Sequence, residues 1–282
     1  MLVSARSFDE YRAMFALTEH DLRLGILDCP GGAAGFVAEA GRRGTDAVAV
    51  DPAYADDRED LGALVLREIR HKHAALVRDA SEYVWTRLGG PERLTRLRSR
   101  AARAFAADIA ARPDRYVAGS LPRLPFPDRS FDLVLGSHLL FSYGARLDED
   151  FHLASLLDLA RVSRWQVRLF PVLLHTSNVR YGPLDRVRSA LAEHGVPSRL
   201  ERVGYEFQPG GDEMLVLSTA GYRPPAAAAP PVRDPAAGAL DPVRWRHREA
   251  PDGRAGPAQA PDPVGDPGPG PGHRGATGRS GA

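Results

Sequence analysis

Near its N-terminus the chain carries a pattern that fits few architectures: an apolar run, a glycine-rich turn, a helix and a second apolar run. The first run, residues 24–29, has Asp28 near its end, and a turn of Gly, Pro and Ala follows it. Apolar residues at helical spacing continue to about Arg42, and the second run is DAVAVD, residues 46–51. Two buried parallel strands joined by a helix form a right-handed βαβ unit. The sequence therefore predicts an α/β domain with a parallel sheet.

The remaining elements extend this unit. Residues from about 55 to 113 are mostly helix formers, with breaks near Gly89 and at Pro113, so two or three inserted helices are expected. Three further strands, two helices and a closing hairpin around QPGGD follow. The strands are expected at residues 116–120, 131–136 and 165–174. The helices are expected at 148–162 and 183–194, and the hairpin at 199–219. The prediction is a doubly wound, mostly parallel seven-stranded sheet with an antiparallel edge strand, plus a helical insertion.

Composition changes sharply near residue 222. The 61 residues from Tyr222 to Ala282 contain 13 prolines and 10 glycines and few large apolar residues. Such a segment buries too little apolar surface to offset its ordering entropy. We expect an α/β domain over residues 1–221, with the insertion at about 55–113, and a disordered tail over 222–282.

Charge and cysteine content exclude several classes of protein. The formal net charge is +1, which argues against a chain that binds nucleic acid mainly through bulk electrostatics. Cys29 is the one cysteine, so an intrachain disulfide and a cysteine-rich zinc site are excluded. No apolar run approaches the length of a membrane span, and the N-terminal residues lack a signal-peptide core. A cytoplasmic location without membrane association is the expectation.

Acidic residues follow both strands of the βαβ unit. In open α/β sheets, ligands bind beyond the carboxyl ends of the strands, where the strand order reverses. Gly31 and Gly32 allow the backbone to approach a ligand closely, and Asp51 at the tip of the second strand can accept hydrogen bonds from both hydroxyls of a ribose. The spacing of a dinucleotide fingerprint is missing, so a pyrophosphate ligand is not indicated. A turn without any ligand is the alternative.

The loop resembles the first motif of the class I S-adenosylmethionine-dependent methyltransferases. That motif places an acidic residue after an apolar strand and glycines at alternate positions beyond it. The matching residues here are Asp28, Pro30, Gly32 and Ala34. Pro30 and Ala34 depart from the pattern, and Pro30 also removes a backbone donor.

A second stretch strengthens the resemblance. LPFPDRSFDLVLGSHLLFSYG, residues 124–144, is similar to the third and fourth strands of small-molecule methyltransferases of this class, and residues 153–172 match their next helix and strand. The resemblance implies S-adenosylmethionine as the cofactor. It also implies that Asp28, Pro30, Gly31 and Gly32 hold the methionine part, that Asp51 holds the ribose, and that Ser120 and Leu121 hold the adenine. Ser137 either binds the methionine part or caps the next element. Ser120 stands where the family has an acidic residue.

His138, at the end of the fourth expected strand, is the predicted catalytic residue. Methyl transfer is an in-line displacement, so a base is needed only if the acceptor must lose a proton. His138 is placed for that role; the alternative is a hydrogen-bonded histidine that shapes the pocket. Tyr11 either closes over the cofactor or is a core aromatic, and Cys29 is interpreted as a small buried hydrophobe.

The insertion carries two charged motifs. RHKH, residues 70–73, has a His-x-His spacing, but no third ligand is evident nearby, so no metal site is predicted. Its second expected helix carries a stripe of arginines, which either binds phosphate groups or is a solvated face. Those arginines are Arg93, Arg96, Arg100 and Arg103. The solvated face is the preferred interpretation, with the insertion covering the acceptor pocket.

Three functions follow for the chain as a whole. The first is S-adenosylmethionine-dependent methyl transfer to a small-molecule acceptor. The second is RNA methylation through the arginine-rich insertion, which the near-neutral charge disfavours. The third is a non-catalytic protein that binds the cofactor as a sensor. The acceptor, the methylated atom and the oligomeric state are not readable from the sequence.

Overall fold

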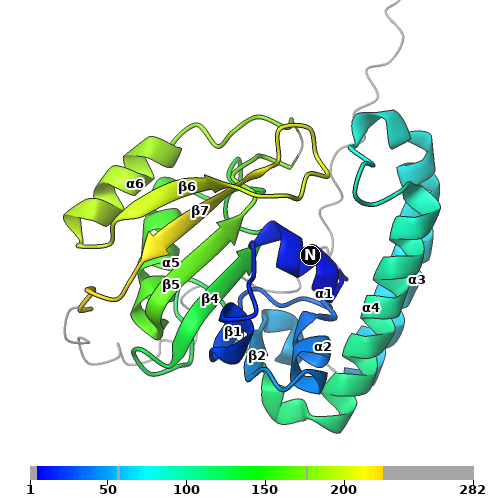
Figure 1. Cartoon of the computed structure of the whole chain (residues 1–282), viewed down its shortest axis with the longest axis horizontal. Helices are drawn as coiled ribbons and strands as arrows, with labels where there is room; N and C mark the ends of the chain where they lie inside the picture. The colour runs from blue at the N-terminus through cyan, green and yellow to red at the C-terminus, as the bar shows by residue number, and fades with distance from the viewer. Residues whose placement is uncertain (1–4, 56–57, 176, 225–282) are drawn as a thin grey trace, which may run out of the picture. The chain divides into compact units, whose positions relative to one another are not determined.

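The computed structural model describes residues 5–55, 58–175 and 177–224. Its centre is a seven-stranded sheet with the order β3-β2-β1-β4-β5-β7-β6 (Figure 1). The strands are β1 (Ile26–Asp28), β2 (Ala47–Val50), β3 (Tyr116–Val117), β4 (Phe131–Ser137), β5 (Ser163–Phe170), β6 (Ser198–Arg202) and β7 (Glu213–Ser218). The predicted tail lies outside the described residues from residue 225 onward, and the expectation for it stays a prediction.

Strand pairing confirms the predicted fold class. β1 pairs in parallel with both β2 and β4. β2 also pairs in parallel with β3, and β4 pairs in parallel with β5. β7 runs antiparallel to both β5 and β6, which are its two neighbours. The predicted hairpin is therefore present, and β7 lies one position in from the edge that β6 occupies.

Six α-helices flank the sheet in the described part of the chain. They are α1 (Phe8–Met14), α2 (Phe36–Arg42), α3 (Arg58–Arg78), α4 (Pro91–Ala111), α5 (Glu149–Val162) and α6 (Leu184–Glu193). Short 3-10 turns lie at Asp21–Arg23, Pro52–Ala55, Ala80–Glu82 and Pro113–Arg115. Ser7 and Glu10 form a reciprocal capping box that begins α1.

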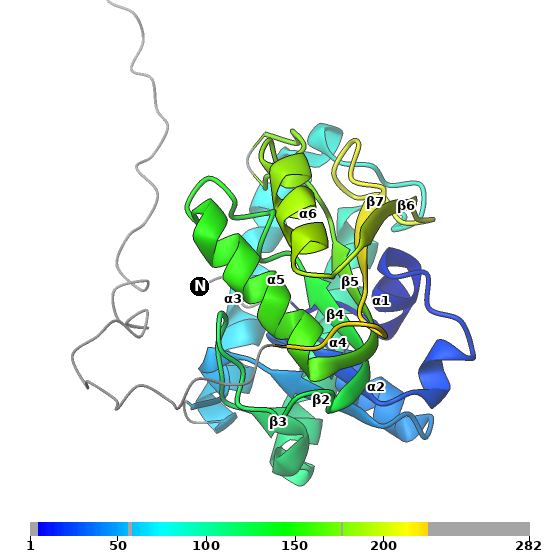
Figure 2. The same cartoon turned by 90° about the vertical axis from the view of Figure 1, so that its left-hand side faces the viewer.

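The two faces of the sheet are covered by different helices. Within β1, Leu27 points into a core shared with α5 and α6, and Ile26 points into a core shared with α1 and α2. This alternation is the period-two pattern of strands buried on both faces. Figure 2 shows α5 and α6 side by side on one of these faces. The sheet is therefore the middle layer of three.

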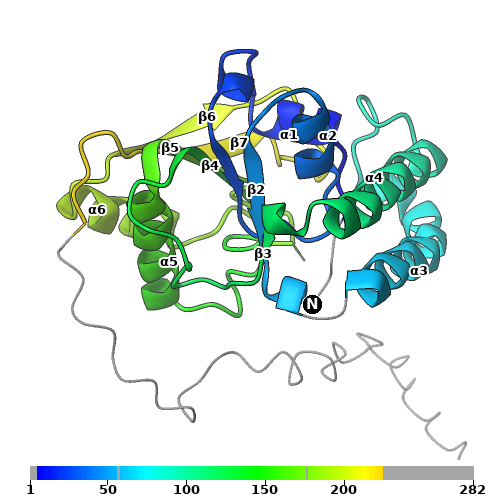
Figure 3. The same ribbon diagram turned by 90° about the horizontal axis from the view of Figure 1, so that it is seen from below.

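The predicted insertion forms a helical hairpin that belongs to the main core. α3 and α4 lie side by side (Figure 3), and α4 packs against α2. The contact is tight, because a Cβ placed on Gly35 would lie 3.0 Å from the Cα of Ala101. Leu94 and Phe105 of α4 are fully buried in the same cluster as Phe36 of α2. The insertion is thus an integral packing layer.

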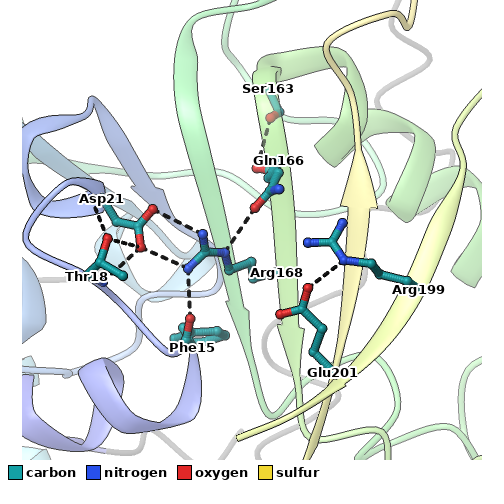
Figure 4. Close-up of polar contacts among 8 residues, drawn as sticks. All are labelled: Phe15, Thr18, Asp21, Ser163, Gln166, Arg168, Arg199 and Glu201. Carbon is teal, nitrogen blue, oxygen red and sulfur yellow. Dashed lines mark hydrogen bonds and ion pairs between the residues drawn. The ribbon is translucent and has the colours of Figure 1, made fainter.

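A buried ion pair ties the segment after α1 to the centre of the sheet (Figure 4). Arg168 of β5 donates two hydrogen bonds to the Asp21 carboxylate, at 3.1 and 3.2 Å, and a third to the carbonyl of Phe15 at 2.9 Å. Asp21 also accepts hydrogen bonds from the backbone and hydroxyl of Thr18. Burial alone raises the pKa of Asp21, but the Thr18 and Arg168 hydrogen bonds outweigh burial and hold this pKa below its ordinary value.

We predict that Asp21→Ala lowers the free energy of unfolding by about 3–5 kcal/mol, because Arg168 is left buried without its counter-charge. The matched control is Glu149→Ala, which breaks the exposed ion pair with Arg186 and is expected to leave the urea midpoint almost unchanged. Because the Asp21 pKa is depressed in the folded state, its contribution is present above about pH 4 and is lost as the pH falls through the folded-state pKa. Equal midpoints for both variants would contradict the prediction.

Candidate functional site

The loop after β1 is bound to the tip of β2 by backbone and carboxylate hydrogen bonds. The amide of Gly31 donates to the carbonyl of Val50 at 3.0 Å. One oxygen of Asp51 accepts from the amide of Gly32 at 3.0 Å, and the other accepts from the amide of Ala53 at 2.9 Å. The two acidic strand ends singled out by the sequence are therefore joined through the glycine loop.

The glycines of this loop are required by its geometry. A Cβ on Gly31 would lie 2.6 Å from the hydroxyl of Tyr54 and 2.7 Å from the Cβ of Ala49. Gly32 has a φ of +53°, in the left-handed region that favours glycine. The Tyr54 hydroxyl, from the 3-10 turn that follows β2, donates to the Gly32 carbonyl at 2.7 Å and fixes the loop. Pro30, just before these glycines, is half-buried.

Asp28, at the end of β1, is held by the N-terminal helix. The hydroxyl of Tyr11 lies 3.0 Å from each oxygen of the Asp28 carboxylate and donates to it. Tyr11 itself is buried and stacks on Phe36 at 4.7 Å between ring centroids. Tyr11 is therefore a core aromatic whose hydroxyl reaches the predicted site residue Asp28, and a contact of Tyr11 with the cofactor stays a prediction.

Both acidic residues have raised pKa values. Burial raises the pKa of Asp28 well above its ordinary value, the charge of Asp51 adds to this, and the Tyr11 hydrogen bond only partly offsets it. Burial likewise raises the pKa of Asp51, while the amides of Ala53 and Gly32 lower it. A positive charge placed near these carboxylates would favour their ionised forms.

Ser137 ends β4 and His138 follows it, next to the β1 loop. His138 has a φ of +51°, which non-glycine residues adopt rarely and which clusters at functional sites. Its Nδ1 lies 2.8 Å from the hydroxyl of Ser137. Burial lowers the pKa of His138 well below its ordinary value, and the charges of Arg6 and Arg98 lower it further. The imidazole is therefore neutral at neutral pH.

The predicted adenine residues, Ser120 and Leu121, lie near the loop and near the end of β2. Leu121 is buried and lines a small pocket together with Pro30 and His138, so three predicted site residues share one cavity. Ser120 is exposed and follows Gly119, whose amide lies 3.4 Å from the carbonyl of Asp51. The structure thus brings the predicted residues to one end of the sheet, while their roles stay predictions.

Cys29 is buried between the strands, as interpreted from the sequence. Burial raises the pKa of its thiol well above the ordinary value, so it is a poor nucleophile.

The charged motifs of the insertion make local contacts or are exposed. Lys72 pairs with Glu68, and the imidazole of His73 lies 2.8 Å from the hydroxyl of Thr95. Among the described residues, no group of three His, Cys, Asp or Glu side chains is placed to hold a metal ion. The members of the predicted arginine stripe are all exposed: Arg93, Arg96, Arg100 and Arg103. Within the described part of the chain, no helix is both long and apolar enough to cross a membrane.

Sequence reasoning missed four residues near the site. Tyr54 binds the glycine loop, and Arg6, Glu10 and Arg98 form a charged cluster close to His138. Tyr54 follows the second acidic strand end closely, which is a usable signal. Arg98 lies among other arginines in one helix, so composition alone does not distinguish it from its exposed neighbours.

No protein-family model matches the chain. An uncharacterized protein of Methanocaldococcus jannaschii is 28% identical over 214 residues, which cover 75% of this chain and 93% of that protein. Solved structures similar to this chain include a magnesium protoporphyrin IX methyltransferase from Synechocystis with bound S-adenosylmethionine. It is 13% identical, with a TM-score of 0.39, and the match covers 75% of this chain and 77% of that one.

Another similar structure is an S-adenosylmethionine-dependent methyltransferase from Aquifex aeolicus, at 14% identity, a TM-score of 0.37 and coverage of 74% of this chain and 93% of that one. A third is the 1,6-didemethyltoxoflavin-N1-methyltransferase of Burkholderia thailandensis, at 14% identity, a TM-score of 0.38 and coverage of 74% and 77%. At these sequence identities and TM-scores, the similar structures support no conclusion about the activity of this chain or about a methyl acceptor.

We predict that Gly31→Ala destabilises the protein by about 1–3 kcal/mol, because the new methyl group overpacks the contact with Tyr54 and Ala49. Gly182→Ala is the control, since a Cβ there would meet no atom within 4 Å. Urea unfolding of both variants measures the difference. A Gly31→Ala protein as stable as the control variant would show that the close approach of loop and strand is not required.

Proposed function

We propose that the chain transfers a methyl group from S-adenosylmethionine to a small-molecule acceptor. One observation carries the proposal: the Asp51 carboxylate lies at the tip of β2, fixed by the Gly32 amide, beside the glycine loop that follows β1. This is the place where open α/β sheets bind nucleosides, with an acidic side chain directed to the ribose. The resemblance of the motifs to class I methyltransferases supports the same cofactor.

The residues present fit an adenosyl ligand with a charged amino-acid end. Each Asp51 oxygen accepts one amide hydrogen and retains a further lone pair, which is what two ribose hydroxyls need. Leu121 offers an apolar contact to the adenine, and Ser120 offers a hydroxyl in place of a carboxylate. Asp28, Ser137 and the backbone at Pro30, Gly31 and Gly32 are assigned to the methionine part. Pro30 supplies no N–H, so this loop presents one donor fewer than the family pattern.

The chain's own residues then have limited chemistry to perform. When bound, S-adenosylmethionine supplies the electrophilic methyl group. The fold supplies proximity and alignment between that group and the acceptor. His138, neutral because of its lowered pKa, is placed to accept a proton from a hydroxyl or amine acceptor through Nε2, while Nδ1 faces Ser137.

Two alternatives remain for the same fold. A non-catalytic sensor would bind the cofactor without turnover, and the departures at Pro30 and Ser120 support it. An RNA methyltransferase would use the exposed arginines of α4, and neutralising Arg96 and Arg100 would then abolish a steep salt dependence of RNA binding. Extracts supplied with isotope-labelled cofactor reveal the acceptor and separate enzyme from sensor.

We predict that Asp51→Ala weakens S-adenosylmethionine binding by about tenfold or more, since two charge-assisted hydrogen bonds to the ribose are lost. Calorimetry with S-adenosylmethionine and S-adenosylhomocysteine measures the affinities. Asp46→Ala is the matched control, because this exposed aspartate precedes the opposite end of the same strand. Equal affinity of Asp51→Ala and the unaltered chain, or no binding by either, would overturn the proposal.

A second prediction concerns His138. Its imidazole is expected to titrate well below pH 6.5, so the acid limb of kcat/KM lies in that range and is absent from His138→Asn. The variant loses about 100-fold in kcat if the histidine accepts the acceptor proton, with cofactor affinity unchanged. His194→Asn, an exposed histidine, is the control. An unchanged kcat and pH profile would leave His138 with a role in pocket shape alone.

A further inference from the structure

Both backbone polar groups of Gly32 are held by the segment that follows β2. Its amide donates to the Asp51 carboxylate at 3.0 Å, and its carbonyl accepts from the Tyr54 hydroxyl at 2.7 Å. Gly32 has a φ of +53°, and a glycine is otherwise free to adopt many conformations. Two hydrogen bonds from residues three positions apart therefore fix the conformation of the most adaptable residue in the loop.

The ring of Tyr54 is enclosed by two other aromatic rings. Tyr54 is 4% exposed; its ring stacks on that of Phe105 at 6.0 Å between centroids and meets that of Tyr116 edge-on at 5.5 Å. Phe105 and Tyr116 also contact each other, at 5.5 Å. All three distances lie in the range of favourable aromatic pairs. The three rings form a closed triangle, so the position of the Tyr54 hydroxyl is set by its two neighbours.

The inserted helix α4 holds this triangle. Phe105 belongs to α4, and Asp108, one helical turn further along, accepts a hydrogen bond from the Tyr116 hydroxyl at 2.8 Å. Phe105 is fully buried and Asp108 is 5% exposed. One face of the insertion thus fixes both rings that surround Tyr54.

The same helix also meets the loop directly, at its far end. Gly35 closes the loop at the start of α2, and a Cβ placed there would lie 3.0 Å from the Cα of Ala101. Ala101 precedes Phe105 by four residues, so the two lie on one face of α4. The glycine loop is therefore bounded by α4 at its end and, through Tyr54, in its middle.

We propose that Tyr54 is a positioning residue that holds the glycine loop in its ligand-binding shape, and that α4 sets the place of Tyr54 through Phe105. The inference rests on the proposed function for the identity of the ligand. A loop fixed before binding loses less conformational freedom when the ligand arrives, which raises affinity. The insertion thereby acts on the cofactor side of the site.

The first test is calorimetry of the full chain with S-adenosylmethionine. Tyr54→Phe keeps the ring triangle and removes the hydrogen bond to the Gly32 carbonyl, so it is expected to weaken binding by about three- to tenfold. Tyr116→Phe is the matched control, because it removes a buried hydroxyl of the same triangle that binds Asp108 and not the loop. It should lower the urea midpoint and leave affinity unchanged. A merely structural role of Tyr54 would move the midpoint alone.

The second test needs no ligand. Amide hydrogen exchange of Gly32, followed by NMR, is expected to be about fivefold faster in Tyr54→Phe than in Tyr116→Phe, because the loop opens more often without its carbonyl partner. Equal exchange in the two variants overturns the inference, as does unchanged affinity of Tyr54→Phe for S-adenosylmethionine. If the unaltered chain does not bind S-adenosylmethionine, the proposed function fails, and the exchange rates alone decide whether Tyr54 fixes the loop.

A double-mutant cycle tests the contribution of α4. Phe105→Leu is expected to weaken S-adenosylmethionine binding by about threefold in the unaltered chain and to have no further effect in Tyr54→Phe, because it acts through the same hydroxyl. Ile109→Val is the control, since Ile109 is fully buried on the same helix and has no aromatic contact with Tyr54. Independent effects of Phe105→Leu and Tyr54→Phe, or equal effects of Phe105→Leu and Ile109→Val on affinity, overturn the role of α4. The exchange rate of Gly32 in the same variants gives this comparison without the cofactor.

Discussion

The hydrogen bond between the Gly32 amide and the Asp51 carboxylate is the constraint on which the candidate site depends. It joins the loop after β1 to the end of β2, and it forms only if the loop passes close to the neighbouring strand. Gly31 permits that approach, because any side chain there would collide with Tyr54 and Ala49. The same hydrogen bond orients the Asp51 carboxylate, whose oxygens each keep a lone pair that can accept a further hydrogen bond. A turn that served only to connect a strand to a helix would not need this arrangement.

The inserted helices change how the rest of the site is built. Because α4 packs on α2 and shares its core, the insertion cannot be removed without exposing Phe36 and its neighbours. The hypothesis that the insertion covers the acceptor pocket stays a prediction. A better view of the insertion comes from Arg98, which α4 directs toward Glu10 while other arginines of the helix face solvent.

Much of this fold could be predicted from the sequence, because apolar runs bounded by turn residues specify strands and their order of appearance specifies βαβ units. Asp28 and Asp51 were found for the same reason, since each closes an apolar run. The sequence does not predict that β7 lies inside the sheet. A hairpin pattern indicates that two strands pair with each other, but not which of the two also pairs with β5. The contact of Tyr11 with Asp28 and the inward direction of Arg98 depend on packing between distant segments, which no local pattern encodes.

The titratable groups of the site share one physical property: burial drives each toward its uncharged form. The pKa values of Asp28 and Asp51 are raised, and that of His138 is lowered. Ligands of the opposite charge would reverse these shifts, because a nearby cation favours an ionised carboxylate and a nearby anion favours a protonated imidazole. Under the proposed function, a sulfonium held near Asp28 would therefore stabilise the ionised form of that carboxylate.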